Sequence, residues 1–173
     1  MKLLPVAALL LLFFGCTQEN QDSELKMPSK NSNISIRSPD FNNNGFIPRE
    51  FTCDGSRLTP RITIENIPKN AKSLALIMDD PDAPMGTFVH WVVWNIPAPT
   101  ANIEDGISGI NSAQKKGYTP PCPPSGIHRY FFRVYALDAT LALNSNSDKN
   151  DLLNAMENHI ISSSEIIGKY ERK

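Results

Sequence analysis

The sequence has no marked excess of either charge. Its 173 residues include 17 lysines and arginines against 18 aspartates and glutamates, so the formal net charge is -1. There is no basic tract, and basic residues do not alternate with aromatic ones as a nucleic-acid-binding surface requires. The composition is ordinary for one soluble globular domain, and it argues against nucleic acid as a partner.

The common motifs of catalysis and cofactor binding are also missing. There is no Gly-x-Ser-x-Gly elbow, and Ser125, between Pro124 and Gly126, is typical of a turn. No glycine-rich motif of the phosphate-cradling type occurs. No His-x-His or His-x-x-x-His pair places two metal ligands on one element. We therefore expect no nucleotide cofactor and no dedicated metal site.

The apolar run at the N-terminus, residues 3–14, is too short to cross a bilayer as a helix. It follows Lys2 and ends at Gly15-Cys16, which resembles the lipobox of bacterial lipoproteins, where the cysteine is diacylated. This pattern predicts a signal peptide over residues 1–15 and lipidation of Cys16. The alternative is an ordinary secretory signal cut elsewhere. Either way we expect an exported protein, and the lipobox predicts one anchored to a membrane of the bacterial cell envelope.

Residues 17–33 are polar and show no apolar period, so they predict a flexible tether between the lipidated Cys16 and a domain over residues 34–173. Two further cysteines, Cys53 and Cys122, belong to that domain. In an exported protein they are candidates for a disulfide, and two buried free cysteines are the alternative.

The sequence pattern predicts β-strands over most of the domain. Residues 34–38 and 61–65 alternate apolar with polar, the period of half-exposed strands. Residues 73–78 and 88–96 are apolar at nearly every position, which predicts strands covered on both faces or packed in a two-layer core. Residues 127–138 form the longest candidate and are rich in aromatic β-formers. We expect the core to lie between sheets.

One convincing helix is predicted near residues 148–161, capped by Ser147 or Asp148. Its apolar residues recur at helical spacing, so one face should pack on the sheet edge. A second short helical turn is expected over residues 164–168.

Three proline-rich passages carry ionisable and aromatic side chains: residues 80–84, 89–91 and 117–130. Proline fixes φ and removes an N–H donor, so these loops should be stiff enough to hold a pocket open. In an extended segment Asp80 and Asp82 lie on one side, with carboxylates roughly 6 to 7 Å apart.

Strand parity places His128 and Tyr130 on the same face of the last passage. His90 lies within an apolar run, and we expect Asp80 or Asp82 to fix its tautomer and raise its pKa. The third histidine, His159, is expected to be structural or exposed.

These passages resemble the phosphatidylethanolamine-binding protein family, in particular its bacterial branch described as Raf kinase inhibitor-like. The resemblance covers residues 34–172, and its motifs are residues 51–55, 80–84, 90–97, 121–126, 128–132 and 168–170. It implies a mainly β fold, in which a central antiparallel sheet packs with a smaller sheet and helices lie at the C-terminal side. It also implies a small cavity at the sheet end that accepts a phosphate or a phospholipid head group.

Carried over residue by residue, the resemblance implies a ligand site that shares acidic, imidazole, aromatic and proline side chains with the family: Asp80, Asp82, Pro84, His90, Trp91, Tyr118, His128 and Tyr130. The sequence departs from the family at Thr119-Pro120, where a glycine is usual, and over residues 57–61. A proline there lacks an N–H, so an anion contact made by that backbone in relatives should be absent.

We therefore expect a non-enzymatic protein that binds a phosphorylated or zwitterionic ligand, with a disulfide between Cys53 and Cys122 beside the pocket. Protonated His90 and His128 would meet phosphate oxygens, and the carboxylates would meet an amine. The alternatives are a hydrolase using the same side chains and an inhibitor or interaction module for a protease or kinase. A protein partner or a homodimer is compatible with this sequence.

Overall fold

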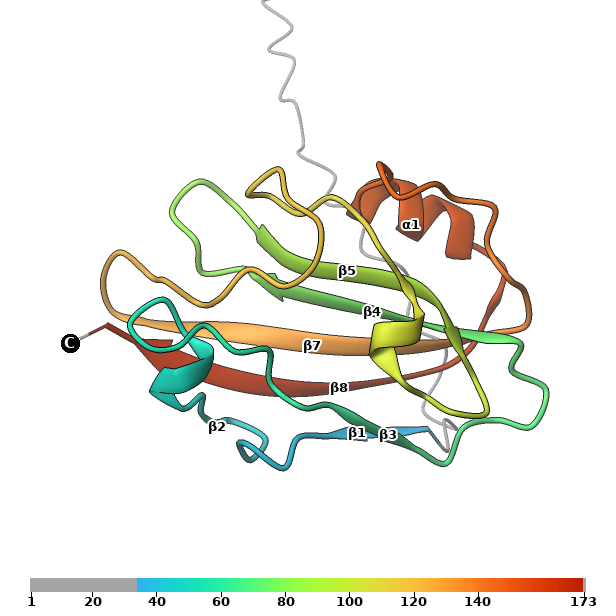
Figure 1. The fold of residues 1–173 in the computed structure, drawn as a ribbon, viewed down its shortest axis with the longest axis horizontal. Coiled ribbons are helices and arrows are strands. Elements are labelled where there is room, and N and C mark those ends of the chain that lie inside the picture. Colours follow the sequence, from blue (N-terminus) through green and yellow to red (C-terminus); the bar gives the residue numbers. More distant parts are fainter. Residues whose placement is uncertain (1–33, 173) are drawn as a thin grey trace, which may run out of the picture.

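The computed structural model describes residues 34–172 (Figure 1). The predicted signal peptide, Cys16 and the tether lie outside the described residues. Within the described part, no helix has the length and apolar character to cross a membrane. The elements in chain order are β1 (Ser35–Arg37), β2 (Gly45–Phe46), the 3-10 turn η1 (Arg49–Phe51), β3 (Thr63–Glu65), β4 (Ser73–Asp80), β5 (Phe88–Pro97), the 3-10 turn η2 (Ile103–Asp105), β6 (Ile107–Ser108), β7 (Ile127–Leu137), α1 (Lys149–Met156) and β8 (Ile160–Glu171).

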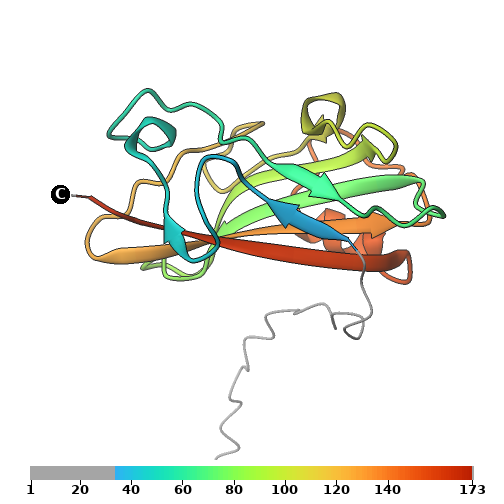
Figure 2. The same cartoon turned by 90° about the horizontal axis from the view of Figure 1, so that it is seen from below.

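The strands form two sheets, as the sequence predicts. A six-stranded sheet has the order β2-β8-β7-β4-β5-β6, and its neighbours are antiparallel except for the short parallel pair of β2 and β8. A two-stranded antiparallel sheet pairs β1 with β3. Figure 2 shows this small sheet lying across one face of the large one.

Both faces of the large sheet are covered. Its strand β4 is apolar at successive positions, which point to opposite faces, and every residue of β4 is buried. Leu74, Leu76 and Met78 contribute to the core beneath β1 and β3. Ala75 and Ile77 point to the other face, where they join the apolar residues of α1 in a second core. The core is therefore double: one half lies between the sheets, as expected, and the other lies under the helix.

The predicted C-terminal helix is too long. Asp148 caps α1 by accepting hydrogen bonds from the backbone N–H groups of Asn150 and Asp151, and the Asp151 side chain reciprocates. The helix ends at Met156, and residues 160–171 form β8, which pairs along the whole of β7. The predicted turn at 164–168 is therefore wrong. Ile160 continues the four-residue apolar spacing of the helix, but pairing with β7 overrides that local pattern.

Candidate functional site

A cavity of about 290 Å³ lies where the C-terminal end of β4 meets the beginnings of β5 and β7. Such a volume is near the lower limit for ligand pockets, so it suits a head group rather than a whole lipid. Its lining residues combine a few ionisable side chains with apolar and proline-rich walls: Asp80, Ala83, Pro84, Phe88, His90, Thr119, Pro120, Cys122, Pro123, Pro124 and His128.

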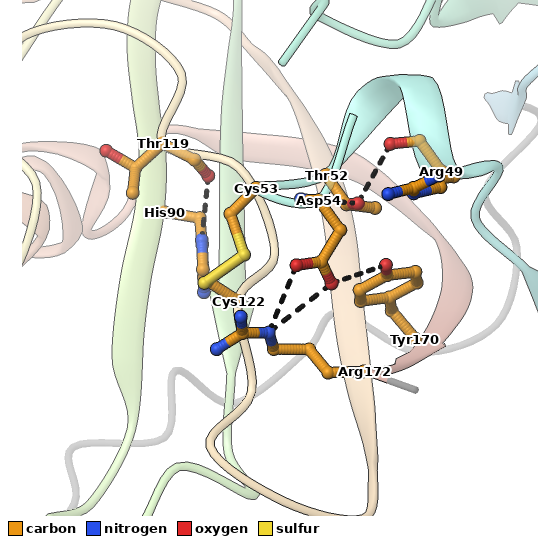
Figure 3. Close-up of a disulfide and its surroundings, with 9 residues drawn as sticks. All are labelled: Arg49, Thr52, Cys53, Asp54, His90, Thr119, Cys122, Tyr170 and Arg172. Atoms are coloured by element: carbon orange, nitrogen blue, oxygen red, sulfur yellow. Dashed lines mark hydrogen bonds and ion pairs between the residues drawn. A yellow bond between two sulfur atoms is a disulfide. The ribbon is translucent and has the colours of Figure 1, made fainter. Parts of the chain in front are cut away.

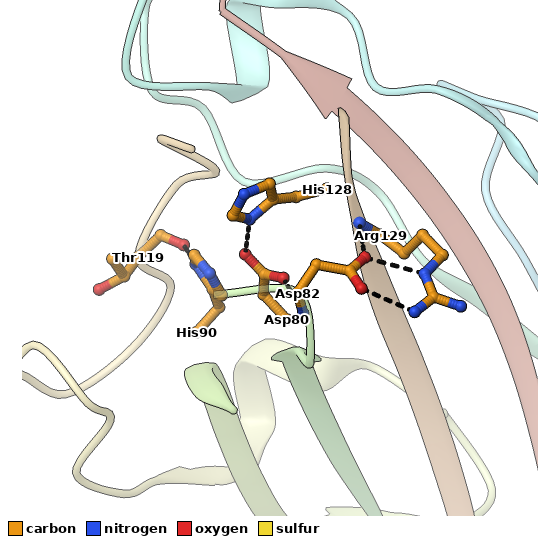
Figure 4. A network of polar contacts seen from close by, with 6 residues as sticks. All are labelled: Asp80, Asp82, His90, Thr119, His128 and Arg129. Atoms are coloured by element: carbon orange, nitrogen blue, oxygen red, sulfur yellow. Dashed lines mark hydrogen bonds and ion pairs between the residues drawn. The ribbon is translucent and has the colours of Figure 1, made fainter. Parts of the chain in front are cut away.

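Strand alternation at the end of β4 separates two neighbouring aspartates. Asp79 points to the α1 face, where its carboxylate binds Arg133 at 2.9 Å and Lys149 at 2.6 Å. Asp80 lines the cavity and accepts a hydrogen bond from Nδ1 of His128 at 2.7 Å (Figure 4). Both partners of this second pair are buried, since β7 parity turns His128 inward as predicted.

A β-bulge in β5 brings His90 to the same cavity. Met78 pairs with Trp91 and Asp79 pairs with Val89, so His90 is an extra residue without a partner on β4. Its ring packs edge-on against the Tyr130 ring, at 5.2 Å between centroids, while Trp91 packs in the core beneath β1 and β3. The bulge thus re-aims one side chain that a regular strand would turn to the opposite face.

His90 does not pair with an aspartate, contrary to the expectation from sequence. Its Nδ1 lies 2.8 Å from the carbonyl oxygen of Thr119, and the Thr119 N–H donates to the His90 carbonyl. A carbonyl oxygen only accepts, so Nδ1 carries the proton and Nε2 of the neutral ring keeps a lone pair. Burial lowers the pKa of His90. This effect outweighs the Thr119 carbonyl and the Asp80 carboxylate, both of which act to raise that pKa.

Asn111 is a positioning residue that the sequence reasoning missed. Its buried side-chain amide donates to the carbonyl oxygen of Gly117 and to Oγ1 of Thr119, each at 2.9 Å. Its Oδ1 accepts from the backbone N–H groups of Ala113 and Lys115. One side chain therefore organises the loop whose Thr119 carbonyl orients His90. An asparagine in a polar loop carries no signal of this role in the sequence.

The depressed pKa of His90 predicts that acid destabilises the protein. The unfolded chain takes up a proton on this imidazole near pH 6.5, whereas the folded protein resists it until a lower pH. The contribution of neutral His90 is thus complete above about pH 6.5 and is lost as pH falls toward the lowered folded value. Denaturant unfolding between pH 5 and 8 should show this loss, with a slope of at most about 1.4 kcal/mol per pH unit.

His90→Gln should flatten that slope, and His159→Gln provides the matched control, because His159 lies on the surface and binds Asp138. An unchanged slope in His90→Gln would assign the acid sensitivity to other groups.

Asp82 is engaged away from the cavity. Its carboxylate accepts from the backbone N–H of Arg129 at 2.9 Å and binds the Arg129 guanidinium at 2.7 and 2.8 Å (Figure 4). These bonds hold the pKa of Asp82 below its usual range. Asp80 and Asp82 are linked only through the Asp82 N–H, which donates to Oδ1 of Asp80. Asp82 therefore braces the loop instead of lining the cavity with Asp80.

The three predicted aromatic residues lie behind the cavity wall. Tyr130 is fully buried, its hydroxyl has no hydrogen-bond partner within the described residues, and burial raises its pKa. Trp91 and Tyr118 pack edge to face at 5.8 Å and line a neighbouring hollow of about 450 Å³. The Tyr118 hydroxyl donates to the Phe51 carbonyl. Among the predicted ligand residues, the cavity wall contains only Asp80, Pro84, His90 and His128.

The predicted disulfide between Cys53 and Cys122 is present (Figure 3). It ties the loop after η1 to the proline-rich segment 120–124, and Cys122 lines the cavity. The Cys53 N–H also donates to the Pro121 carbonyl at 3.0 Å. Next to the bridge, Asp54 binds the Tyr170 hydroxyl near the end of β8 and Arg172 just after that strand. The bridge therefore fixes one wall of the cavity to the body of the domain.

Among residues 34–172, no group of three or more histidine, cysteine, aspartate or glutamate side chains is placed to hold a metal ion. The ionisable residues in the cavity wall form one pair, Asp80 with His128, and a separate His90. Their chemistry is that of proton donors and acceptors around a small polar ligand.

Known proteins are similar to this chain in sequence. A family model described as phosphatidylethanolamine-binding protein matches residues 37–171. A UPF0098 protein of Pyrococcus horikoshii is 43% identical over 189 residues, which cover 99% of this chain and 90% of that protein.

Two solved structures superimpose on the fold. A phosphatidylethanolamine-binding protein homologue from Chlamydia trachomatis has a TM-score of 0.78 and 38% identity, covering 82% of this chain and 100% of its own. YbcL of E. coli, described as a new member of the mammalian family, has a TM-score of 0.74 and 26% identity with the same coverage. Because the family model spans most of the sequence and the folds agree along both solved chains, this chain belongs to the phosphatidylethanolamine-binding protein family.

Proposed function

We propose that the protein binds, without converting it, a small ligand that carries a phosphate group, either a free phospho-compound or a phospholipid head group. The observation that carries the proposal is the buried Asp80–His128 pair at the wall of a cavity of about 290 Å³, whose other lining residues are mainly apolar. Ionisable side chains are costly to bury, so a hydrogen-bonded pair of them kept at a cavity wall favours a ligand-binding role over a structural one.

The site suits a ligand with both an anionic and a hydrogen-donating group. With Nδ1 held by the Asp80 carboxylate, a protonated His128 donates from Nε2 to a phosphate oxygen. Neutral His90 accepts at Nε2, so it pairs with an amine or hydroxyl on the ligand. The two histidines therefore take opposite roles, in place of the shared anion-binding role expected from sequence.

Binding without conversion is supported by the chemistry of the wall. The sulfur of Cys122 is in a disulfide, and Ser125 is not among the lining residues. The Thr119 hydroxyl accepts from Asn111, and within residues 34–172 no basic side chain is hydrogen-bonded to it. A hydrolase that forms a covalent intermediate would need an activated side-chain nucleophile at this wall.

The proposal predicts binding that weakens as pH rises. Calorimetric titration with phosphoethanolamine should give the tightest binding at mildly acidic pH, because His128 donates from both ring nitrogens only when it is protonated. His128→Gln should weaken binding about ten- to a hundredfold, the equivalent of one charge-assisted hydrogen bond. His159→Gln is the control and should bind like wild type. Equal affinity in His128→Gln would place the ligand elsewhere.

We also propose that the protein is exported and held to a membrane by a lipid on Cys16. The motif at Gly15-Cys16 motivates this, and the Cys53–Cys122 bridge supports it, because disulfides persist in oxidising compartments outside the cytoplasm.

Replacing Cys16 by serine should shift the full-length protein from the membrane fraction to the soluble fraction, because the acceptor of the lipid is removed. Fractionation followed by mass measurement of the mature N-terminus checks this. Cys53→Ser serves as the control for loss of a cysteine as such. A Cys16→Ser variant that stays in the membrane fraction would refute lipid anchoring at this residue.

A further inference from the structure

The cavity has an unusual charge balance for an anion site. None of its lining residues is lysine or arginine. Two arginines, Arg129 and Arg172, are bound to Asp82 and Asp54 and do not line the cavity. Within residues 120–124, only Cys122 has a backbone N–H, because the other four are prolines. The wall therefore has no permanent cation and few backbone donors.

The imidazole groups add acceptors when they are neutral. His90 uses Nδ1 on the Thr119 carbonyl, and His128 uses Nδ1 on the Asp80 carboxylate (Figure 4). Both oxygens can only accept, so Nδ1 is the protonated nitrogen in each ring and Nε2 carries the lone pair. Within residues 34–172, the side-chain hydrogen bonds of His90 and His128 are made through Nδ1, which leaves each Nε2 available to a ligand. An unprotonated phosphate or sulfate oxygen would thus lie against the lone pair on Nε2 of His90, and two acceptors that face each other repel.

A ligand can remove this conflict by bringing its own proton. A phosphomonoester keeps one acidic P–OH below its second pKa of about 6. Phosphodiesters and sulfate esters of the same charge have no acidic proton in this pH range.

We propose, resting on the function proposed above, that the cavity selects the protonated monoanion of phosphate monoesters over phosphodiesters and sulfate esters. The ligand P–OH donates to Nε2 of His90, and a second oxygen accepts from Nε2–H of protonated His128, whose charge Asp80 balances. A free phosphomonoester satisfies this requirement through its phosphate, whereas the diester of an intact phospholipid does not.

Three probes of equal charge test the selection in the wild-type domain at about pH 5: methyl phosphate, dimethyl phosphate and methyl sulfate. All are monoanions below the phosphomonoester pKa of about 6, and methyl sulfate matches methyl phosphate in size. We expect methyl phosphate to bind at least about tenfold more tightly than either of the others, because an unpaired buried acceptor is costly. Equal affinities for the three would overturn the selection and leave the proposed function standing. Binding of none of them, and none of phosphoethanolamine, would overturn both.

A second pair of probes distinguishes the two sources of phosphate. Phosphoethanolamine and glycerophosphoethanolamine share the amine, but only the first has an acidic P–OH. Phosphoethanolamine should bind more tightly at pH 5, and this advantage should shrink by pH 8. Equal affinity at pH 5 would assign His90 to the amine and overturn the preference for a free monoester.

The His90→Gln variant identifies the residue responsible. Glutamine offers an amide N–H as well as a carbonyl, so it no longer penalises an unprotonated oxyanion, and the preference for methyl phosphate over methyl sulfate should narrow toward equality. His159→Gln should retain it. A His90→Gln variant that folds and keeps the full preference would refute the role of His90. If that variant fails to fold, the wild-type comparison still decides the selection.

Discussion

Replacing Cys53 and Cys122 together by alanine should lower the free energy of unfolding by about 4 kcal/mol. The bridge joins residues 69 positions apart, so in the chain-entropy model it removes a large part of the freedom of the unfolded chain. Denaturant unfolding of the soluble domain beginning after Cys16 would measure the change. The wild-type domain in a reducing agent should approach the stability of the variant in which both cysteines are replaced by alanine.

The same substitution should weaken ligand binding, because the bridge holds the wall that contains Cys122. The hydrogen bond from the Cys53 N–H to the Pro121 carbonyl would be left to hold this wall locally. Thiol counting on the denatured, unreduced domain provides the covalent check and should find none. A loss of stability below about 1 kcal/mol would contradict the entropic account, and two free thiols would contradict the bridge itself.

Replacing Asp80 by alanine should cost about 3 kcal/mol of stability and weaken phosphoethanolamine binding at least about tenfold. The Asp80 and His128 side chains are 4% and 7% exposed, so removing the carboxylate leaves the His128 Nδ1–H buried without its acceptor. It also removes the acceptor of the Asp82 N–H and the negative charge that balances a protonated His128. Chemical denaturation and calorimetric titration would measure the two effects.

Asp82→Ala is the matched control, since the two aspartates are separated only by Pro81. Asp82 pairs with a guanidinium that is half exposed, and such surface pairs contribute about 0 to 1 kcal/mol. We therefore expect a small loss of stability and nearly normal binding in Asp82→Ala. Equal losses in the two variants would mean that Asp80 has no special role in the cavity.

These two aspartates show where sequence reasoning reached its limit. The sequence placed Asp80 and Asp82 near one end of the sheet and predicted that their carboxylates lie on one side and could act as a pair, but only Asp80 lines the cavity. Their partners come from β7, 47 or 48 residues further along the chain. Which carboxylate meets a histidine and which meets an arginine depends on the register of β4 against β7, and local spacing does not contain that register.

His90 and the C-terminal strand were misread for related reasons. Predictions of which side chains share a strand face assume that successive residues point to opposite faces. The β-bulge at His90 interrupts this alternation, and His90 bonds to a backbone carbonyl instead of an aspartate. In β8, the apolar spacing of Ile160 matches a helix as well as a strand, and only the long pairing with β7 decides between them.

By itself the sequence determined the features that depend on short-range pattern: the shared face of His128 and Tyr130, the strands β4, β5 and β7, a cap at Ser147 or Asp148, and through its motifs the family fold and the candidate cysteine pair. Periodicity, capping and motif identity are encoded within a few residues, so they can be read without a structure. Only the tertiary structure decided which side chains meet. Contacts between distant strands pair Asp80 with His128 and set the tautomer of His90. They also keep three aromatic side chains out of the cavity wall, namely Trp91, Tyr118 and Tyr130. The register and the bulges behind these contacts arise from packing the whole sheet, so local sequence does not contain them.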